Sequence, residues 1–319
     1  MKTYYISIVI PIYNEIENLA PLIEKLWDWA KTHQGQYEII FINDCSTDGC
    51  REKLNDLACK DAHIKVIHFR RNSGQTTALQ AGFDHARGDI IVPMDGDLQN
   101  DPADIPKLLD KIEEGFDVVS GWRKNRRDNR IKRNLPSKAA NWLISKISGV
   151  YLHDYGCTLK AYKRDIITDI KLYGEMHRFI PIYASWQGAK VSEIEVTHHP
   201  RIQGQSKYGL ERTVKVILDL IVVKFLDKYS QKPMYVFGGF GIFSIVLSIL
   251  CFGLMLYYKY FEAISFIQTP LPLLAVLFFL MGFISILMGF IAEIVMRTYF
   301  ESQDKATYVV DHSCDLKET

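Results

Sequence analysis

Short apolar runs alternate with helical patterns over residues 1–120. The runs that we expect to form strands are Tyr4–Ile10, Tyr37–Asn43, Ile64–Phe69, Asp89–Met94 and Phe116–Gly121. Strands that alternate with amphipathic helices are typical of a mostly parallel sheet that helices cover. The pattern predicts a Rossmann-like α/β domain. The first run is not followed by G-x-G-x-x-G, so a dinucleotide-binding function loses its main support.

Three polar positions predict where helices begin. Asn14 precedes Glu17 by three residues, as in a capping box. Ser73 precedes the helical stretch G-Q-T-T-A-L-Q-A-G-F, and Asp101 is followed by Pro102, which suits the first position of a helix.

Two long uncharged stretches occur in the last third of the chain, Pro233–Tyr258 and Thr269–Ala292. Each exceeds the roughly 20 residues that a helix needs to cross a bilayer, so we expect two transmembrane helices. The flanking basic residues lie outside the two stretches: Lys224, Lys228, Lys232, Arg297 and Lys305. By the positive-inside rule, both ends of the chain and the α/β domain face the cytosol at the plasma (inner) membrane.

Several small residues lie within these two stretches: Gly239, Gly241, Gly282, Ser285 and Gly289. Small residues let helices approach closely. The contact could form within one chain or in a homo-oligomer, and the sequence leaves this open.

Two further segments combine an apolar stripe with basic residues. The first covers about residues 131–150 and follows the basic stretch R-K-N-R-R-D-N-R-I-K-R. We expect it to lie in the membrane interface, although a helix that covers the sheet is the alternative. The second forms a juxtamembrane helix within residues 209–232. The predicted organisation is therefore a cytosolic domain at 1–208, this helix, a two-helix membrane region at 233–296 and a cytosolic tail at 297–319.

The overall composition excludes some classes of protein. Apolar residues make up 48% of the chain and the formal net charge is +1, which supports a packed core and does not favour a nucleic-acid-binding protein. The six cysteines show no C-x-x-C spacing, which fits reduced thiols in a cytosol and does not favour a zinc site.

The stretch Asp89–Gln99 carries the clearest candidate chemistry. Its apolar run ends in M-D-G-D-L-Q, which places Asp95, Asp97 and Gln99 in a turn at the carboxyl end of a predicted strand. Open α/β sheets bind ligands at that edge. Two carboxylates and an amide are hard oxygen ligands, suited to Mg²⁺ or Mn²⁺ shared with substrate phosphates. A polar turn without an ion is the alternative.

The first two predicted strands also end in polar residues. P-I-Y-N-E places Pro11, Tyr13 and Glu15 at the same edge, and N-D-C-S-T-D-G places Asp44 there. A carboxylate at this edge could accept a hydrogen bond from a pyrimidine N3–H or from ribose hydroxyls, and Tyr13 could flank a base. Helix caps or solvated turns are the alternative, which we favour for Glu17 and Asp48.

The ordered motifs resemble one known family. P-I-Y-N-E, N-D-C-S-T-D-G, N-S-G-Q-T-T-A-L-Q-A-G, A-R-G-D-I-I-V-P-M-D-G-D-L-Q and H-H-P-R-I-Q-G-Q-S-K-Y are similar to those of the GT-A glycosyltransferases of family 2. Within that family the chain most resembles enzymes that load a sugar onto a polyprenyl phosphate, such as polyisoprenyl-phosphate glucosyltransferases and dolichol-phosphate mannose synthase. The motifs cover about the first 210 residues, and the two spans resemble the glucosyltransferase subgroup.

The resemblance implies roles on the donor side. Asp95, Asp97 and Gln99 would hold the divalent ion on the donor diphosphate, which assists departure of the leaving group in place of a general acid. Arg201, Ser206 and Lys207 would fold over that diphosphate, although a surface loop of this composition is the alternative.

The resemblance also implies that the basic stretch binds the acceptor. A phosphate monoester, with its second pKa near 6, is largely a dianion at cytosolic pH, so it can attack the sugar without a strong general base. The enzyme must supply positive charge, and the candidates are Arg123, Arg126, Arg127, Arg130, Lys132 and Arg133, with Arg123 first. Some of these residues could bind only anionic lipid headgroups.

Asp154, in L-H-D-Y-G-C-T-L-K, matches a family position that faces the sugar or the acceptor. It could contact a sugar hydroxyl or orient the phosphate, and a turn aspartate before Gly156 is the alternative. The chain lacks a clear catalytic-base motif, which puts a basic role for Asp154 in doubt. We interpret His177, His198 and His199 as structural, because a third metal ligand is not evident nearby.

The sequence therefore predicts an inverting, metal-dependent transfer of glucose from UDP-glucose to a polyprenyl phosphate of the undecaprenyl type. Mannose from GDP-mannose and aminoarabinose from its UDP donor remain alternatives. A processive polysaccharide synthase is disfavoured because Trp186-Gln187 does not continue a Q-x-x-R-W motif. From another class, the chain could be a silent scaffold that binds nucleotide sugar, which the full set of donor-side residues argues against.

Overall fold

The computed structural model describes residues 4–124, 141, 144–146, 148–168, 170, 176–200 and 233–302. Contacts divide the chain into two compact units, Met1–Leu220 and Ile221–Thr319. The predicted juxtamembrane helix at 209–232 and most of the predicted interfacial helix at 131–150 lie outside the described residues.

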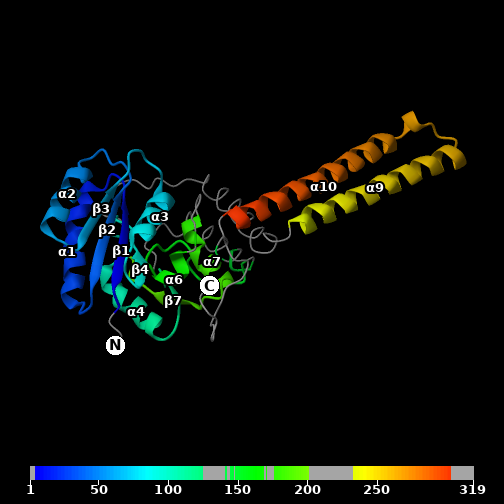
Figure 1. Cartoon of the computed structure of the whole chain (residues 1–319). Helices are drawn as coiled ribbons and strands as arrows, with labels where there is room; N and C mark the ends of the chain where they lie inside the picture. Colours follow the sequence, from blue (N-terminus) through cyan, green and yellow to red (C-terminus); the bar gives the residue numbers. More distant parts are fainter. Residues whose placement is uncertain are drawn as a thin grey trace. The chain divides into compact units, whose positions relative to one another are not determined.

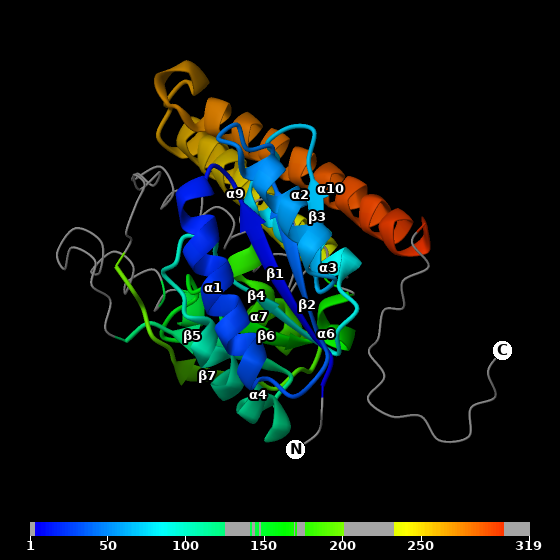
Figure 2. The ribbon, with the colours of Figure 1, turned by 90° about the vertical axis from the view of Figure 1, so that its left-hand side faces the viewer.

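The first unit, labelled in Figure 1 from β1 to β7 with β5 and β6 labelled in Figure 2, is built on a seven-stranded mixed sheet with the order β3-β2-β1-β4-β6-β5-β7. The strands are β1 (Ile6–Ile12), β2 (Tyr37–Asn43), β3 (Ile64–His68), β4 (Ile90–Pro93), β5 (Val118–Trp122), β6 (Lys160–Lys163) and β7 (Val191–Glu195). All neighbouring pairs are parallel except those of β6, which runs antiparallel to β4 and β5. The mostly parallel sheet is confirmed, and the five predicted strands form within two residues of their expected starts.

Helices cover both faces of the sheet. They are α1 (Ile16–Thr32), α2 (Cys50–Lys60), α3 (Gln75–His85), α4 (Ile105–Glu113), α6 (Arg164–Thr168) and α7 (Ile180–Trp186), with short 3₁₀ turns η1 (Pro102–Asp104) and η2 (Met176–Arg178). Alternate side chains of β1 separate the two cores, because successive residues of a strand point to opposite faces. Ile8 packs with α1, α2 and α4, whereas Val9 packs with α3, α6 and α7. Figure 2 shows α1 and α4 in front of the sheet.

The structure corrects two of the three predicted helix starts and confirms the third. At α3 the N-cap residue is Gly74, with no side-chain cap, so Ser73 precedes the cap and does not form it. The cap predicted for Asn14 is wrong: α1 begins after Glu15, and Asn14 has a positive φ of 54° and accepts a hydrogen bond from Thr47 N instead. Asp48 Oδ2 accepts from Ile16 N, and its Oδ1 accepts from Cys50 N, so this carboxylate serves the starts of both α1 and α2. The cap at Asp101 is confirmed, since its side chain accepts from Ala103 N.

The described part of the second unit consists of α9 (Met234–Phe261), η3 (Phe266–Gln268) and α10 (Leu271–Ser302). Both long helices are apolar enough to cross a membrane, with mean hydropathies of 2.4 and 2.7. Only 22% and 17% of their most apolar windows is buried, which is unlike the core helices of a soluble domain. Helix α10 continues to Ser302, so residues 297–302 of the predicted tail are helical, and residues 303–319 lie outside the described part of the chain.

Small residues form the contact between α9 and α10. A Cβ on Gly282 would lie 2.7 Å from Gly241 O, and one on Gly241 would lie 2.8 Å from Gly282 O. Ser248 Oγ donates to Ala275 O at 2.7 Å. Three of the predicted contact glycines, Gly241, Gly282 and Gly289, therefore pack within one chain, whereas a Cβ on Gly239 would meet nothing within 4 Å.

Candidate active site

The carboxyl ends of β1, β2 and β4 meet at one edge of the sheet because these strands are parallel and adjacent. Pro11 is the second-last residue of β1 and lies opposite Ile42 of β2. Asp44 N donates to Ile12 O at 2.9 Å. Asp95 follows β4 by two residues. The topology thus brings the acidic strand ends to one edge, as the sequence predicted.

Asp95 is held by two side chains from distant parts of the chain. Gln75 Nε2, at the start of α3, donates to Oδ1 at 2.7 Å, and Thr158 Oγ1 donates to Oδ2 at 2.8 Å. Burial raises the pKa of the Asp95 carboxyl, although the Thr158 hydroxyl and the nearby charges of Arg123, Lys160 and Arg178 act in the opposite direction. A desolvated carboxylate in fixed orientation is well suited to bind a cation.

Gly96, between the two carboxylates, lies close to the end of β1. A Cβ at this position would lie 2.4 Å from Ile12 Cδ1 and 3.4 Å from Pro11 O. A larger residue at this position would therefore displace the end of the Ile12 side chain, so glycine lets the turn lie against the end of β1 without that shift.

The Asp97–Gln99 turn is joined to the segment that follows β7. Gln99 N donates to Asp97 Oδ1 at 3.2 Å, and Gln99 O accepts from His199 N at 3.0 Å. Asp101 Oδ2 binds His199 Nε2 at 2.7 Å, and Asp104 Oδ2 accepts from Thr197 N at 2.6 Å. These bonds fix residues 197–199 beside the turn.

The predicted base-binding residues differ in their environments. Asp44 is 3% exposed, and its two oxygens accept from Ser73 N at 2.7 Å and Gly74 N at 2.8 Å, so it shapes the loop before α3. Tyr13 is 38% exposed at the end of β1. Glu15 is the N-cap residue of α1, and its side chain accepts from Asn18 Nδ2. Contacts of Asp44, Tyr13 and Glu15 with a nucleotide remain predictions.

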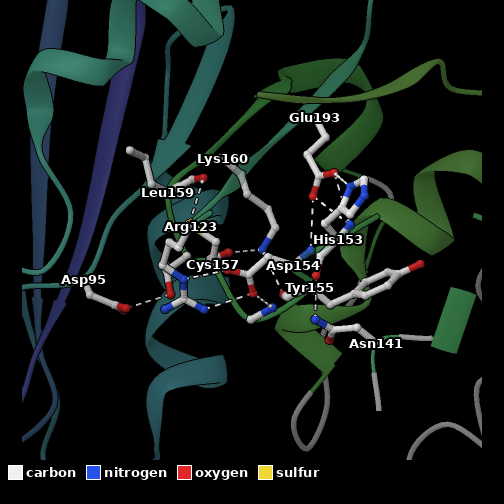
Figure 3. Close-up of polar contacts among 12 residues, drawn as sticks. Asp95, Arg123, Asn141, His153, Asp154, Tyr155, Cys157, Leu159, Lys160 and Glu193 are labelled. Atoms are coloured by element: carbon white, nitrogen blue, oxygen red, sulfur yellow. Dashed lines mark hydrogen bonds and ion pairs between the residues drawn. The ribbon is translucent and has the colours of Figure 1, made fainter. Parts of the chain in front are cut away.

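Arg123 and Asp154 form a bidentate ion pair (Figure 3). Arg123 Nε donates to Oδ2 at 2.7 Å and Arg123 Nη2 donates to Oδ1 at 3.0 Å, with side chains only 11% and 6% exposed. Burial opposes the charged form of Arg123, but the carboxylate outweighs this effect and raises the pKa of the guanidinium. Among the described residues, Arg123 Nη1 has no hydrogen-bond partner, which leaves donors for an anion.

One short segment connects this pair to Asp95. Asp154 begins the stretch D-Y-G-C-T-L-K, Thr158 binds Asp95, and Lys160 starts β6. Lys160 is 3% exposed, and its Nζ donates to Tyr155 O at 3.4 Å and to Cys157 O. Burial lowers the pKa of Lys160 to about 8. Burial also raises the pKa of the Cys157 thiol to about 11, so this cysteine is not poised as a nucleophile.

The residues present fit a divalent ion whose coordination shell comes partly from the protein and partly from a substrate. No cluster of three or more His, Cys, Asp or Glu side chains suited to a metal occurs in the described part of the chain. Asp95 and Asp97 would therefore supply the carboxylates, and phosphate oxygens and water would complete the shell, as Mg²⁺ prefers. Gln99 offers its amide oxygen, while its main chain is already used.

The structure shows the partners of His177 and His199. His177 is buried and its Nδ1 lies 2.7 Å from Thr76 Oγ1, and burial lowers the pKa of this imidazole well below its usual value. His199 pairs with Asp101. The remaining predicted binding residues lie outside the described residues: Arg126, Arg127, Arg130, Lys132, Arg133, Arg201, Ser206 and Lys207.

Sequence reasoning assigned no role to Gln75, Thr158 or Lys160. Gln75 lies in the quoted motif N-S-G-Q-T-T, and the other two lie in the stretch after Asp154. The motifs marked these stretches as important, but only the fold shows that two of the side chains converge on Asp95.

Residues 7–171 match the family model described as glycosyl transferase family 2. The chain belongs to this family and is a glycosyltransferase with the GT-A fold. It is 39% identical to the dodecaprenyl-phosphate galacturonate synthase of Rhizobium johnstonii, over 97% of this chain and 93% of that protein. It is 35% identical to the undecaprenyl-phosphate 4-deoxy-4-formamido-L-arabinose transferase of Shewanella sediminis, over 96% and 91% of the two chains.

A solved structure has the same fold over 69% of this chain. The glucosyl-3-phosphoglycerate synthase of Mycobacterium tuberculosis, in complex with Mn²⁺ and UDP-glucose, aligns with a TM-score of 0.53 at 17% identity, over 69% of this chain and 79% of that one. At this identity the similarity concerns the fold.

Proposed function

We propose that the protein transfers a sugar from a nucleoside diphosphate to a polyprenyl phosphate at a membrane surface. The observation that carries the proposal is the Arg123–Asp154 pair, which residues 154–158 connect to Asp95. One segment thus contacts both Arg123, the proposed cation for the acceptor phosphate, and Asp95, the proposed carboxylate of the donor side. The two relatives named above, each matched over more than nine-tenths of both chains, act on lipid phosphates by their names.

On the donor side, Asp95 and Asp97 hold Mg²⁺ or Mn²⁺. A bound ion would supply positive charge for the diphosphate leaving group. The chain's own contribution is orientation: Gln75 and Thr158 hold both oxygens of Asp95, and Gly96 places the turn against β1. Arg201, Ser206, Lys207 and Gln99 complete the diphosphate site in this proposal, with Tyr13, Glu15, Pro11 and Asp44 around the nucleoside.

On the acceptor side, Arg123 binds the phosphate dianion. A phosphate oxygen attacks the anomeric carbon while the bond from that carbon to the diphosphate breaks, which inverts the configuration. The nucleophile is already ionised, so no proton needs to be removed. Asp154 orients Arg123 in this scheme, because a carboxylate in a bidentate pair with a guanidinium is a weak base. Arg126, Arg127, Arg130 and Lys132 add charge near the membrane.

The sugar is the open part of the proposal. The sequence favours glucose from UDP-glucose, whereas the named relatives transfer galacturonate and 4-deoxy-4-formamido-L-arabinose. We propose a UDP-linked sugar and expect the preferred one among these three, with mannose from GDP-mannose as the remaining alternative.

Helices α9 and α10 anchor the enzyme in the membrane in this proposal. Their large apolar side chains are mostly exposed within the chain, for example Ile249 at 64% and Leu273 at 74%, and a bilayer would cover them. With both termini cytosolic, the active site would face the pool of nucleotide sugars.

The test is transfer by the purified full-length protein. Each radiolabelled nucleotide sugar is incubated with undecaprenyl phosphate and Mg²⁺ or Mn²⁺, and the label in the lipid extract is counted. We expect one donor to label the lipid, EDTA to abolish the signal, and Asp97→Ala to remove nearly all of it. Asp110→Ala, an exposed carboxylate on α4, is the matched control and keeps full activity. Absence of transfer with every donor would refute the proposal and favour a silent nucleotide-sugar-binding scaffold.

A further inference from the structure

The segment His153–Lys160 carries residues that serve both halves of the proposed active site. Asp154 pairs with Arg123, and Thr158 binds Asp95. Apart from its final residue, the segment belongs to no helix or strand, so other contacts must fix its position. Its main-chain groups show what these contacts are.

Glu193, in the middle of β7, binds the beginning of the segment. Its Oε1 accepts from His153 N at 2.9 Å and from Asp154 N at 3.1 Å, and its Oε2 accepts from His153 Nδ1 at 2.7 Å (Figure 3). The Glu193 side chain is 12% exposed. A largely buried carboxylate with several N–H donors forms strong, directional contacts.

Lys160 binds the middle of the same segment. Its buried ammonium donates to the carbonyls of Tyr155 and Cys157, on either side of Gly156. Gly156 N in turn donates to Asp154 Oδ1 at 3.0 Å. Glu193 therefore holds the N–H groups before the turn, and Lys160 holds the carbonyl groups within it.

We propose that Glu193 is a positioning residue for the transfer reaction: it sets the main chain at Asp154, and through Asp154 the direction of the Arg123 guanidinium. Lys160 is the second anchor of the same turn. The inference rests on the proposed function, because it assigns Arg123 to the acceptor phosphate. Glu193 acts on the acceptor side, since its bonds end at residues 153 and 154, whereas Asp95 retains Gln75 as an independent partner.

β7 supplies a matched control. Glu195 lies two residues from Glu193, but its side chain is 54% exposed and pairs with Lys124 instead of with the segment. Glu193→Ala removes every bond that Glu193 makes to residues 153 and 154 and leaves the other contacts of those two residues in place. Glu193→Gln keeps an amide oxygen that can accept from both main-chain N–H groups, so it should rescue the function.

The first measurement is steady-state kinetics of the full-length enzyme with each substrate varied. We expect Glu193→Ala to raise the KM for undecaprenyl phosphate about tenfold or more and to leave the KM for the nucleotide sugar within about twofold, since small displacements of a positioning group are costly. Glu193→Gln and Glu195→Ala should stay close to wild type. Equal changes in both KM values, or a wild-type acceptor KM in Glu193→Ala, would overturn the inference.

If Glu193→Ala does not fold, Glu193→Asp carries the test, because it keeps the charge and shortens the reach by one methylene. A wild-type acceptor KM in Glu193→Asp would then overturn the inference.

The second measurement does not depend on activity. Hydrogen exchange followed by mass spectrometry should show faster exchange in the peptide that contains residues 153–158 for Glu193→Ala, and unchanged exchange there for Glu195→Ala. If the wild-type protein transferred no sugar, the proposed function would fail while this experiment still tested the anchor. Unchanged exchange in Glu193→Ala would refute the anchor itself.

Discussion

Removal of one partner from the Arg123–Asp154 pair should destabilise the domain strongly, and removal of both should not. The two side chains are 11% and 6% exposed. In Asp154→Leu the guanidinium stays buried without its carboxylate, which costs about 3–5 kcal/mol. In a unit of this size each kcal/mol lowers the melting temperature by about 2–4 °C. We therefore expect a decrease of about 6–20 °C in Asp154→Leu, and a similar one in Arg123→Met.

The double variant separates charge burial from packing. Arg123→Met with Asp154→Leu replaces the pair by apolar side chains, and such exchanges are about neutral for stability. We expect its melting temperature to recover most of the loss, while transfer activity stays absent in all three variants because the acceptor cation is lost or misdirected.

The assay is thermal unfolding of the purified full-length protein in detergent, followed by near-ultraviolet circular dichroism, beside the transfer assay. Either of two results would refute the reasoning: a single variant as stable as wild type, which would mean that solvent reaches the remaining charge, or a double variant less stable than both single variants. A double variant that regained activity would show that the pair does not serve the acceptor.

Two further predictions concern other contacts. Thr158→Val removes the hydroxyl that donates to Asp95 Oδ2 and should weaken Mn²⁺ binding about 10-fold to 100-fold, as measured by the Mn²⁺ dependence of transfer. Thr158→Ser keeps the hydroxyl and should behave as wild type. Unchanged Mn²⁺ dependence in Thr158→Val would contradict this role. Gly282→Ala places a Cβ 2.7 Å from Gly241 O and should lower the stability of the helix pair by about 1–3 kcal/mol, as measured by thermal unfolding. Gly253→Ala, where a Cβ meets nothing within 4 Å, should leave the stability unchanged. Equal stabilities of the two variants would argue against the close contact.

The strands that sequence reasoning located are those with continuous apolar runs. β2 was predicted with its observed bounds, and β1 and β4 within two residues, because both faces of these strands are buried and few polar residues interrupt them. β6 has the sequence K-A-Y-K and is only four residues long. With a lysine at each end, it has no apolar run long enough to predict a strand. β7, V-S-E-I-E, is only partly buried and was not among the predicted strands, because Ser192, Glu193 and Glu195 leave no continuous apolar run.

Sequence reasoning predicted the candidate acids that directly follow strands, and it missed hydrogen-bond partners that are distant in the chain. Asp95 could be found because the carboxyl edge of a parallel sheet is a ligand-binding position. Gln75 and Thr158 lie 20 and 63 residues away from it in the chain, and local pattern does not reveal such pairs. The helix cap predicted for Asn14 was wrong for a related reason. The Asn14 side chain accepts from Thr47 N in another loop, which the local sequence pattern does not reveal.

The antiparallel strand β6 has a consequence for how this enzyme could be redesigned. Because β6 runs opposite to β4 and β5, its first residue lies at the same edge of the sheet as the last residues of those strands. The chain leaves that edge at Arg123 and returns to it at Asp154, and the ion pair between them joins the point of departure to the point of return. A segment exchanged between these two residues would therefore keep both of its attachment points at that edge, and we expect such an exchange to leave the contacts of Gln75 and Thr158 with Asp95 in place.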